Sequence, residues 1–202
     1  ISVSAFLLNR SSDLAIDIYD LKGIEYFAAL ESLNLDRNIL KSVDVSKNRN
    51  LAYLRVGWNQ LTSLDVSKNK ALRFLMCGGN SLTNLNASGC MALEWIRCWR
   101  NRFNGAAMDS LVKNLPSVKK AYLHAIDSLY ERNAMTSSQV AAAKAKGWLP
   151  TKYANRAWID YAGSEPLPVV IADDRAEIDS SVVSSKYVFP EDVKPLIRTQ
   201  WG

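Results

Sequence analysis

The chain has 202 residues, of which 48% are hydrophobic and 22% are charged, and its formal net charge is +5. This composition excludes wholesale disorder, which needs low hydrophobicity and a high net charge. No apolar run approaches the ~20 residues of a membrane-spanning helix, so we expect no transmembrane segment. The positive charge is modest and includes turn lysines, which argues against nucleic acid as a partner.

The chain begins with Ile1 rather than with methionine. We therefore expect a processed or trimmed piece from which a signal peptide or lipid anchor has been removed. The segment Leu14–Leu21 alternates apolar residues and is a candidate strand. The segment Leu21–Leu30 follows it as a degenerate first unit of a repeat, in which Ile24 takes the place of Val45.

A hydrophobic pattern recurs every 21 residues as far as Phe103, and each unit reads L-x-x-L-x-L-x-x-N-x-L. Cys, Val, Ile or Phe replaces some of the leucines. This pattern is the leucine-rich repeat signature, whose period is ~20–29 residues. The aligned positions are Leu30, Leu51, Leu72 and Leu93; Leu33, Leu54, Leu75 and Ile96; Leu35, Val56, Cys77 and Cys98; Asn38, Asn59, Asn80 and Asn101; and Leu40, Leu61, Leu82 and Phe103.

The alternation within each unit predicts a short strand, because successive strand side chains point to opposite faces. Leu54 and Val56 should point inward, while Tyr53, Arg55 and Gly57 point outward. Stacked units would form a parallel sheet on a concave side and bury a continuous leucine column. We expect each repeat asparagine to bond backbone groups at the bend after its strand.

The second half of each unit repeats as well, in the segments Ser42–Asn48, Ser63–Asn69 and Asn84–Cys90. The Asp-x-Ser-Lys-Asn element of the first two segments predicts a tight turn on the convex side. Asp44 and Asp65 recur with the repeat, which marks them as turn residues.

After Phe103 the pattern changes to that of a cap. Asn104 is a candidate N-cap for a helix that ends before Pro116, and the segment Lys119–Ile126 reads as a strand. Thr136 and Gln139 have capping-box spacing for a second helix, which Gly147 should end. The predicted fold is therefore α/β: a leucine-rich repeat solenoid over residues 1–163, with repeats at about 24–103 and the cap at about 104–163.

The opening Leu21–Phe27, the units like Leu61–Asn69 and the cap together resemble secreted or surface leucine-rich repeat proteins of gut anaerobic bacteria. The resemblance covers roughly residues 13–163. It implies an extracellular or cell-surface protein that binds something, without naming the ligand.

Residues 164–202 are rich in proline and serine, which suits a linker or an extended strap. The strap could pack on the solenoid. The end of the segment, Val193–Gly202, resembles the entry segment of the mature domain in streptopain-type cysteine peptidases. That resemblance implies a catalytic domain beyond Gly202.

Nothing in the chain predicts catalysis, a metal site or a cofactor. Cys77 and Cys98 fall at equivalent inward positions and should pack in the core as small hydrophobic residues. Cys90 replaces a turn asparagine and should serve as a compact turn residue. His124, the chain's one histidine, is expected in the cap strand with a structural or surface role. We therefore interpret the chain as a non-enzyme.

The outward columns vary between units and are unusually aromatic. Glycines at Gly57, Gly78 and Gly79 should open space beside them. Aromatic and arginine side chains are enriched at binding hot spots, although the rings could also simply stack on one another or lie under the tail. The predicted ligand-binding residues are Tyr53, Arg55, Trp58, Phe74, Met76, Trp95, Arg97, Trp99 and Arg100.

We expect a protein or peptide ligand on this face. Three functions stay open: a protein-recognition or adhesin module, a carbohydrate-binding accessory domain, and the N-terminal region of a larger cysteine peptidase.

Overall fold

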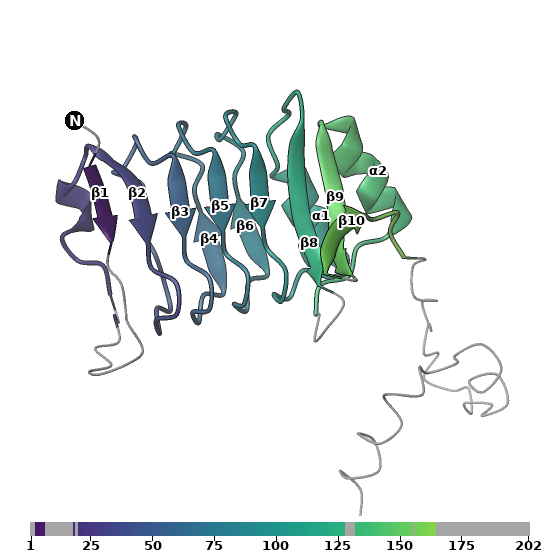
Figure 1. The fold of residues 1–202 in the computed structure, drawn as a ribbon, viewed down its shortest axis with the longest axis horizontal. Coiled ribbons are helices and arrows are strands. Elements are labelled where there is room, and N and C mark those ends of the chain that lie inside the picture. Colours follow the sequence, from purple (N-terminus) through teal and green to yellow (C-terminus); the bar gives the residue numbers. More distant parts are fainter. Residues whose placement is uncertain (1–2, 7–17, 19, 128–131, 155, 165–202) are drawn as a thin grey trace, which may run out of the picture. The chain divides into compact units, whose positions relative to one another are not determined.

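The protein is a mixed α/β structure with a parallel sheet and few helices (Figure 1). The computed structural model describes residues 3–6, 18, 20–127, 132–154 and 156–164. Most of the candidate strand Leu14–Leu21 and nearly all of the predicted tail therefore lie outside the described residues, as does the resemblance at Val193–Gly202.

One large sheet runs through this part of the chain, with the strand order β1-β2-β3-β5-β7-β8-β9-β10. Each neighbouring pair is parallel except the last, since β10 runs antiparallel to β9. The strands are β1 (Val3–Phe6), β2 (Leu30–Asn34), β3 (Tyr53–Arg55), β5 (Phe74–Met76), β7 (Trp95–Arg97), β8 (Ala121–Asp127), β9 (Trp148–Ala154) and β10 (Ala157–Asp160).

The 21-residue spacing sets the register of the sheet. Leu33 pairs with Leu54, which pairs with Leu75, which in turn pairs with Ile96. These side chains are at most 1% exposed, whereas Tyr53 on the other face is 44% exposed. The predicted inward positions of Leu54 and Val56 and outward positions of Tyr53 and Arg55 are therefore confirmed, whereas Gly57 is buried. Each leucine buried in this way contributes ~1.5–3 kcal/mol relative to an exposed one.

The second halves of two units form short strands as well as turns. The strands β4 (Ser63–Asp65) and β6 (Asn84–Asn86) pair in parallel as a separate two-stranded sheet, which the turn pattern did not predict. The predicted tight turn follows directly, because Asp65 Oδ1 accepts a hydrogen bond from the Ser67 amide at 2.8 Å. Burial acts to raise the pKa of Asp65, but hydrogen bonds from the Ser67 side chain and backbone, with smaller contributions from Asn86 and Lys68, lower it overall.

The repeat asparagines tie neighbouring units together, as predicted. Asn80 Nδ2 donates to the carbonyls of Val56 and Cys77 at 2.9 and 3.0 Å. Its Oδ1 accepts from the Leu61 amide at 3.0 Å. Asn59 and Asn101 repeat this arrangement one unit earlier and one unit later.

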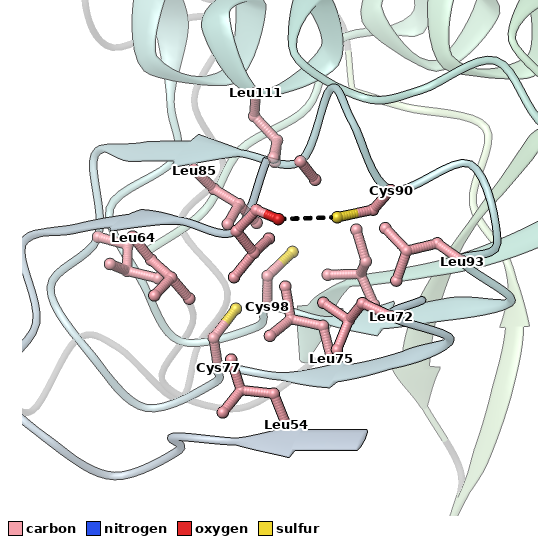
Figure 2. Packing of buried hydrophobic residues seen from close by; sticks show 14 of the residues in the cluster. Leu54, Leu64, Leu72, Leu75, Cys77, Leu85, Cys90, Leu93, Cys98 and Leu111 are labelled. Atoms are coloured by element: carbon pink, nitrogen blue, oxygen red, sulfur yellow. Dashed lines mark hydrogen bonds between the residues drawn. The ribbon is translucent and has the colours of Figure 1, made fainter. Parts of the chain in front are cut away.

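A second set of buried residues does the same on the opposite side of each unit. Asn69 Nδ2 donates to the carbonyls of Val45 and Asn48 at 2.9 and 2.8 Å. In the next unit Cys90 takes this place, with its Sγ 3.0 Å from the Val66 carbonyl oxygen (Figure 2). The thiol thus replaces the amide as donor, which confirms Cys90 as a compact turn residue.

The predicted first unit is confirmed by the same contacts. Ile24 is buried and begins a short 3-10 helix, η1 (Ile24–Tyr26). Asn48 Nδ2 donates to the Ile24 carbonyl at 2.8 Å, as Asn69 does to that of Val45. Cys77 and Cys98 are buried side by side among the leucines, as expected (Figure 2).

Among the described residues after Phe103 there are two helices and three strands. Helix α1 (Gly105–Lys113) and helix α2 (Ser137–Ala145) are both confirmed, and α1 packs against β6 and α2. Thr136 and Gln139 form the predicted capping box, and Gly147 has φ +86° just after α2. The Asn104 side chain does not cap α1 and donates instead to the Arg132 carbonyl. Strand β8 was predicted, whereas β9 and β10 were not.

Replacing Asn80 by Ala should lower the free energy of unfolding by ~1–3 kcal/mol, because it strips partners from buried backbone groups. Urea unfolding measures the change. Asn50→Ala is the matched control, since the exposed Asn50 amide makes one 3.2 Å bond to the Ala28 carbonyl. Equal unfolding midpoints for the two variants would contradict the role given to Asn80.

Candidate ligand-binding face

Outward residues of the large sheet form a continuous aromatic column. Tyr53 pairs with Phe74, which pairs with Trp95, which pairs with Tyr122 of the cap strand β8. The Tyr53 and Phe74 rings stack with centroids 4.7 Å apart and planes 14° apart. Phe74 and Trp95 meet edge to face at 5.2 Å. Tyr122 was not among the predicted ligand-binding residues. Its position in a predicted strand with alternating apolar residues could have indicated that it continues the aromatic column.

A second outward column carries the arginines. It runs through Arg55, Met76 and Arg97 and continues into His124 of β8. Arg55 Nε donates to the Asp36 carboxylate at 2.7 Å, so its charge is compensated within the chain. Arg97 is half-buried and lies over the Trp95 ring, with its guanidinium carbon 4.5 Å from the ring centre. Burial, and then the charge of Arg55, lower the pKa of Arg97.

These two columns enclose a hollow of about 310 Å³ on the outer face of the sheet. Tyr53 is half-exposed at its edge, with no ring on the neighbouring strand to cover its far side. The lining residues are Ser32, Asn34, Tyr53, Leu54, Arg55, Phe74, Met76 and Trp95. The sheet therefore brings five of the predicted ligand-binding residues to one place.

Of the four other predicted residues, Arg97 lies beside the hollow without lining it, and the remaining three form a separate cluster where the chain leaves the strands. Trp58 and Trp99 meet edge to face at 5.7 Å. The Arg100 guanidinium carbon lies 5.6 Å from each ring centre, and its Nε is 2.9 Å from Asp127 Oδ2. Trp58, Trp99 and Arg100 thus do not line the hollow.

The expectation that glycines open space beside the columns is wrong. Gly57 and Gly78 are buried. A Cβ on Gly78 would lie 3.0 Å from the Trp99 ring, and one on Gly79 would lie 2.7 Å from the Trp58 ring. The indoles of neighbouring units therefore fill the space that these glycines leave. Gly79 shares its left-handed backbone conformation with the equivalent residues Arg37, Trp58 and Arg100.

His124 lies at the end of the second column and is half-buried. Its Nδ1 lies 2.7 Å from Thr151 Oγ1, and its ring centre is 4.3 Å from that of Trp158. Burial, and next the charge of Arg97, lower the pKa of His124 to about 4. The imidazole is therefore neutral at pH 7. Trp158 belongs to the unpredicted strand β10, so its contact with His124 had no counterpart in the repeat pattern.

Within the described part of the chain, no group of three or more His, Cys, Asp or Glu side chains is placed to hold a metal ion. No helix among these residues is long and apolar enough to cross a bilayer. All three cysteines are buried and unpaired.

No protein-family model matches the chain, and neither does any curated protein. A solved structure that resembles it is the functional domain of InlJ from Listeria monocytogenes, which is described as including a cysteine ladder. The sequence identity is 20% and the TM-score is 0.37. The match covers 63% of this chain, which spans about 35% of that protein. A likeness at this level assigns neither a ligand nor an activity.

Replacing Gly79 by Ala should destabilise the protein by more than ~1 kcal/mol, because the new methyl meets the Trp58 ring and the backbone has φ +72°. Gly23→Ala is the control: it has φ +94° and open space around its Cβ position. Thermal unfolding of both variants separates the clash from the backbone strain. Equal losses would mean that the Trp58 ring moves aside freely.

The stability of the wild-type protein should fall as the pH drops from 6.5 towards 4. In that window the unfolded chain protonates His124 and the folded chain does not, so protons favour unfolding. The slope is at most ~1.4 kcal/mol per pH unit, and solvent near the half-buried ring reduces it.

Urea unfolding at pH 7, 6 and 5 measures this slope, with His124→Gln as the comparison. The variant retains the carboxylates but not the imidazole, so its stability should change less over the same range. Identical pH dependence in the two proteins would rule out a depressed pKa at His124.

Proposed function

We propose that the chain is a leucine-rich repeat solenoid that acts as a non-catalytic, extracellular or cell-surface binding module. Its ligand is a protein or peptide segment held on the outer face of the large sheet. The observation that carries this proposal is the hollow of about 310 Å³, walled by Tyr53, Phe74 and Trp95 and floored by the sheet. The in-register pairing of 21-residue units supports the solenoid.

The ring geometry favours a peptide over a glycan. Sugars bind best to an open aromatic face, but Tyr53 and Phe74 stack on each other and so cover two of their faces. What remains exposed is largely ring edges together with Met76, a surface suited to apolar and amide groups. The polar groups of Ser32, Asn34 and Arg55 in the same hollow can orient a peptide backbone.

The carbohydrate-binding function remains the alternative, and the exposed far side of Tyr53 is what favours it. The role as part of a cysteine peptidase depends on Val193–Gly202, which the structure does not describe. Translation of the gene beyond Gly202 tests it directly, through the presence or absence of a catalytic Cys and His.

The triple variant Tyr53→Ala, Trp95→Ala, Arg97→Ala should lose at least ~100-fold in affinity for peptides selected on the wild-type protein from a displayed random library, because hot-spot residues each contribute 1 kcal/mol or more. Its circular dichroism spectrum and thermal midpoint should stay close to those of the wild type, since these side chains lie outside the leucine core.

The control carries Tyr26→Ala, Arg49→Ala and Met91→Ala, which remove an aromatic ring, a charge and an apolar side chain at exposed positions away from this face. It should bind the selected peptides as the wild type does. Undiminished binding by the first variant would refute the proposed face. Binding only to members of a glycan array would replace the peptide with a carbohydrate.

A further inference from the structure

The outer face of the large sheet holds one arginine that differs from its neighbours. Arg55 is paired with Asp36, Arg73 with Glu94, and Arg100 with Asp127. No described carboxylate lies within 4.0 Å of the Arg97 guanidinium, and its buried Nε has no hydrogen-bond acceptor among the described residues. Arg97 is thus a cation that the described residues leave without an anionic partner, although the Trp95 ring attracts it.

The surroundings of Arg97 make that lack of a partner costly. The guanidinium lies 4.5 Å from the Trp95 ring centre, and its strand neighbours in the same column are Met76 and His124. A partly desolvated charge among such side chains is less stable than one in water. An anion beside it would restore the lost interaction, and the restricted access of water would strengthen the attraction.

The neighbouring groups favour a singly charged anion. Arg55 is already engaged by Asp36, and His124 is bonded to Thr151, so Arg97 alone supplies full positive charge at this point. A phosphate group carries close to two charges and usually needs an arginine cluster. A carboxylate matches one guanidinium in charge and in planar geometry.

We propose that Arg97 binds a carboxylate of the peptide ligand, with Trp95 and Met76 beside it and His124 at its cap side. This inference rests on the proposed function and names the chemistry that the ligand must contain. The carboxylate comes either from an aspartate or glutamate side chain or from the peptide's own C-terminus. The residue next to it in the ligand lies towards the hollow that Tyr53 and Phe74 line.

The first test uses acetate alone, at pH 6.5 and constant ionic strength, and follows the side-chain NMR signals of Arg97 Nε–H and of the single histidine. Acetate should produce saturable shifts in the wild type and in Arg73→Gln, which removes the same charge from an arginine already paired with Glu94. In Arg97→Gln the histidine shifts should need at least ~10-fold more acetate. Acetamide, the neutral analogue, should shift neither signal.

Equal histidine shifts in all three proteins, or equal effects of acetate and acetamide, would overturn the carboxylate site. Shifts that saturate in the wild type and not in Arg97→Gln would establish it whether or not any peptide binds. If acetate binding depends on Arg97 in this way but no peptide or protein ligand is found, the carboxylate site stands and the proposed function is wrong.

The second test uses the peptides selected on the wild-type protein, each made with a free and with an amidated C-terminus, and with every Asp or Glu changed to its amide. One of these changes should weaken binding to the wild type and to Arg73→Gln by ~10-fold or more. The same change should have little effect on binding to Arg97→Gln. The chemical change that matters identifies the source of the carboxylate.

Peptides that bind the face equally well with and without any carboxylate would overturn the inference while leaving the proposed function standing. An acidic preference that persists unchanged in Arg97→Gln would do so as well, since another cation would then be responsible.

Discussion

The hydrogen bonds of buried asparagines to the preceding unit are the constraint on which the other features depend. Each of these amides bonds at least one carbonyl of the preceding unit, so a unit of a different length would leave buried backbone groups without partners. The Asn80 amide, for example, bonds Val56 in the previous unit and Cys77 in its own. This requirement holds the period at 21 residues, and the period in turn places Leu54 against Leu75 and Tyr53 against Phe74.

Because buried residues fix the register of the strands, the residues at outward positions can differ from one unit to the next. No outward side chain in the repeated units is needed to close the core, and so Ser32, Tyr53, Phe74 and Trp95 can share one column. The variation is nevertheless coupled between units at the ends of the strands. The Trp58 ring lies where a side chain on Gly79 would be, so this tryptophan requires a glycine at the equivalent position of the next unit.

The sequence predicts the repeated part of the fold well, because its periodicity reports a requirement that recurs in every unit. Both helices and β8 were also predictable, from the capping residues around Thr136 and from apolar spacing. The strand β9 was not, since Pro150 lacks an amide hydrogen and is unusual inside a sheet. The small sheet of β4 and β6 was missed because Asp65 and Asn86 indicate turns when read one unit at a time.

The candidate face was predictable in part for the same reason. The alternation within a unit assigns Tyr53 and Arg55 to one face, and the period assigns Phe74, Trp95 and Arg97 to their neighbours. The pairing of arginines with acidic side chains could not be predicted in this way, because it depends on which arginine lies beside which acid in the folded chain. The pairing of Arg55 with Asp36, and the lack of such a partner at Arg97, could not be read from spacing. Neither could the position of Trp158, which reaches His124 from a later strand.

The reactivity of the three cysteine thiols reports when the repeated units separate from one another. All three are unpaired and fully enclosed, and burial raises the pKa of Cys77 and Cys90 to about 12. Thiol reagents react with the ionised form, so alkylation at neutral pH must wait until a unit separates from its neighbours. Because Cys77 and Cys90 lie at opposite edges of one unit and Cys98 lies in the next unit, the order in which they are labelled shows which of these parts opens first.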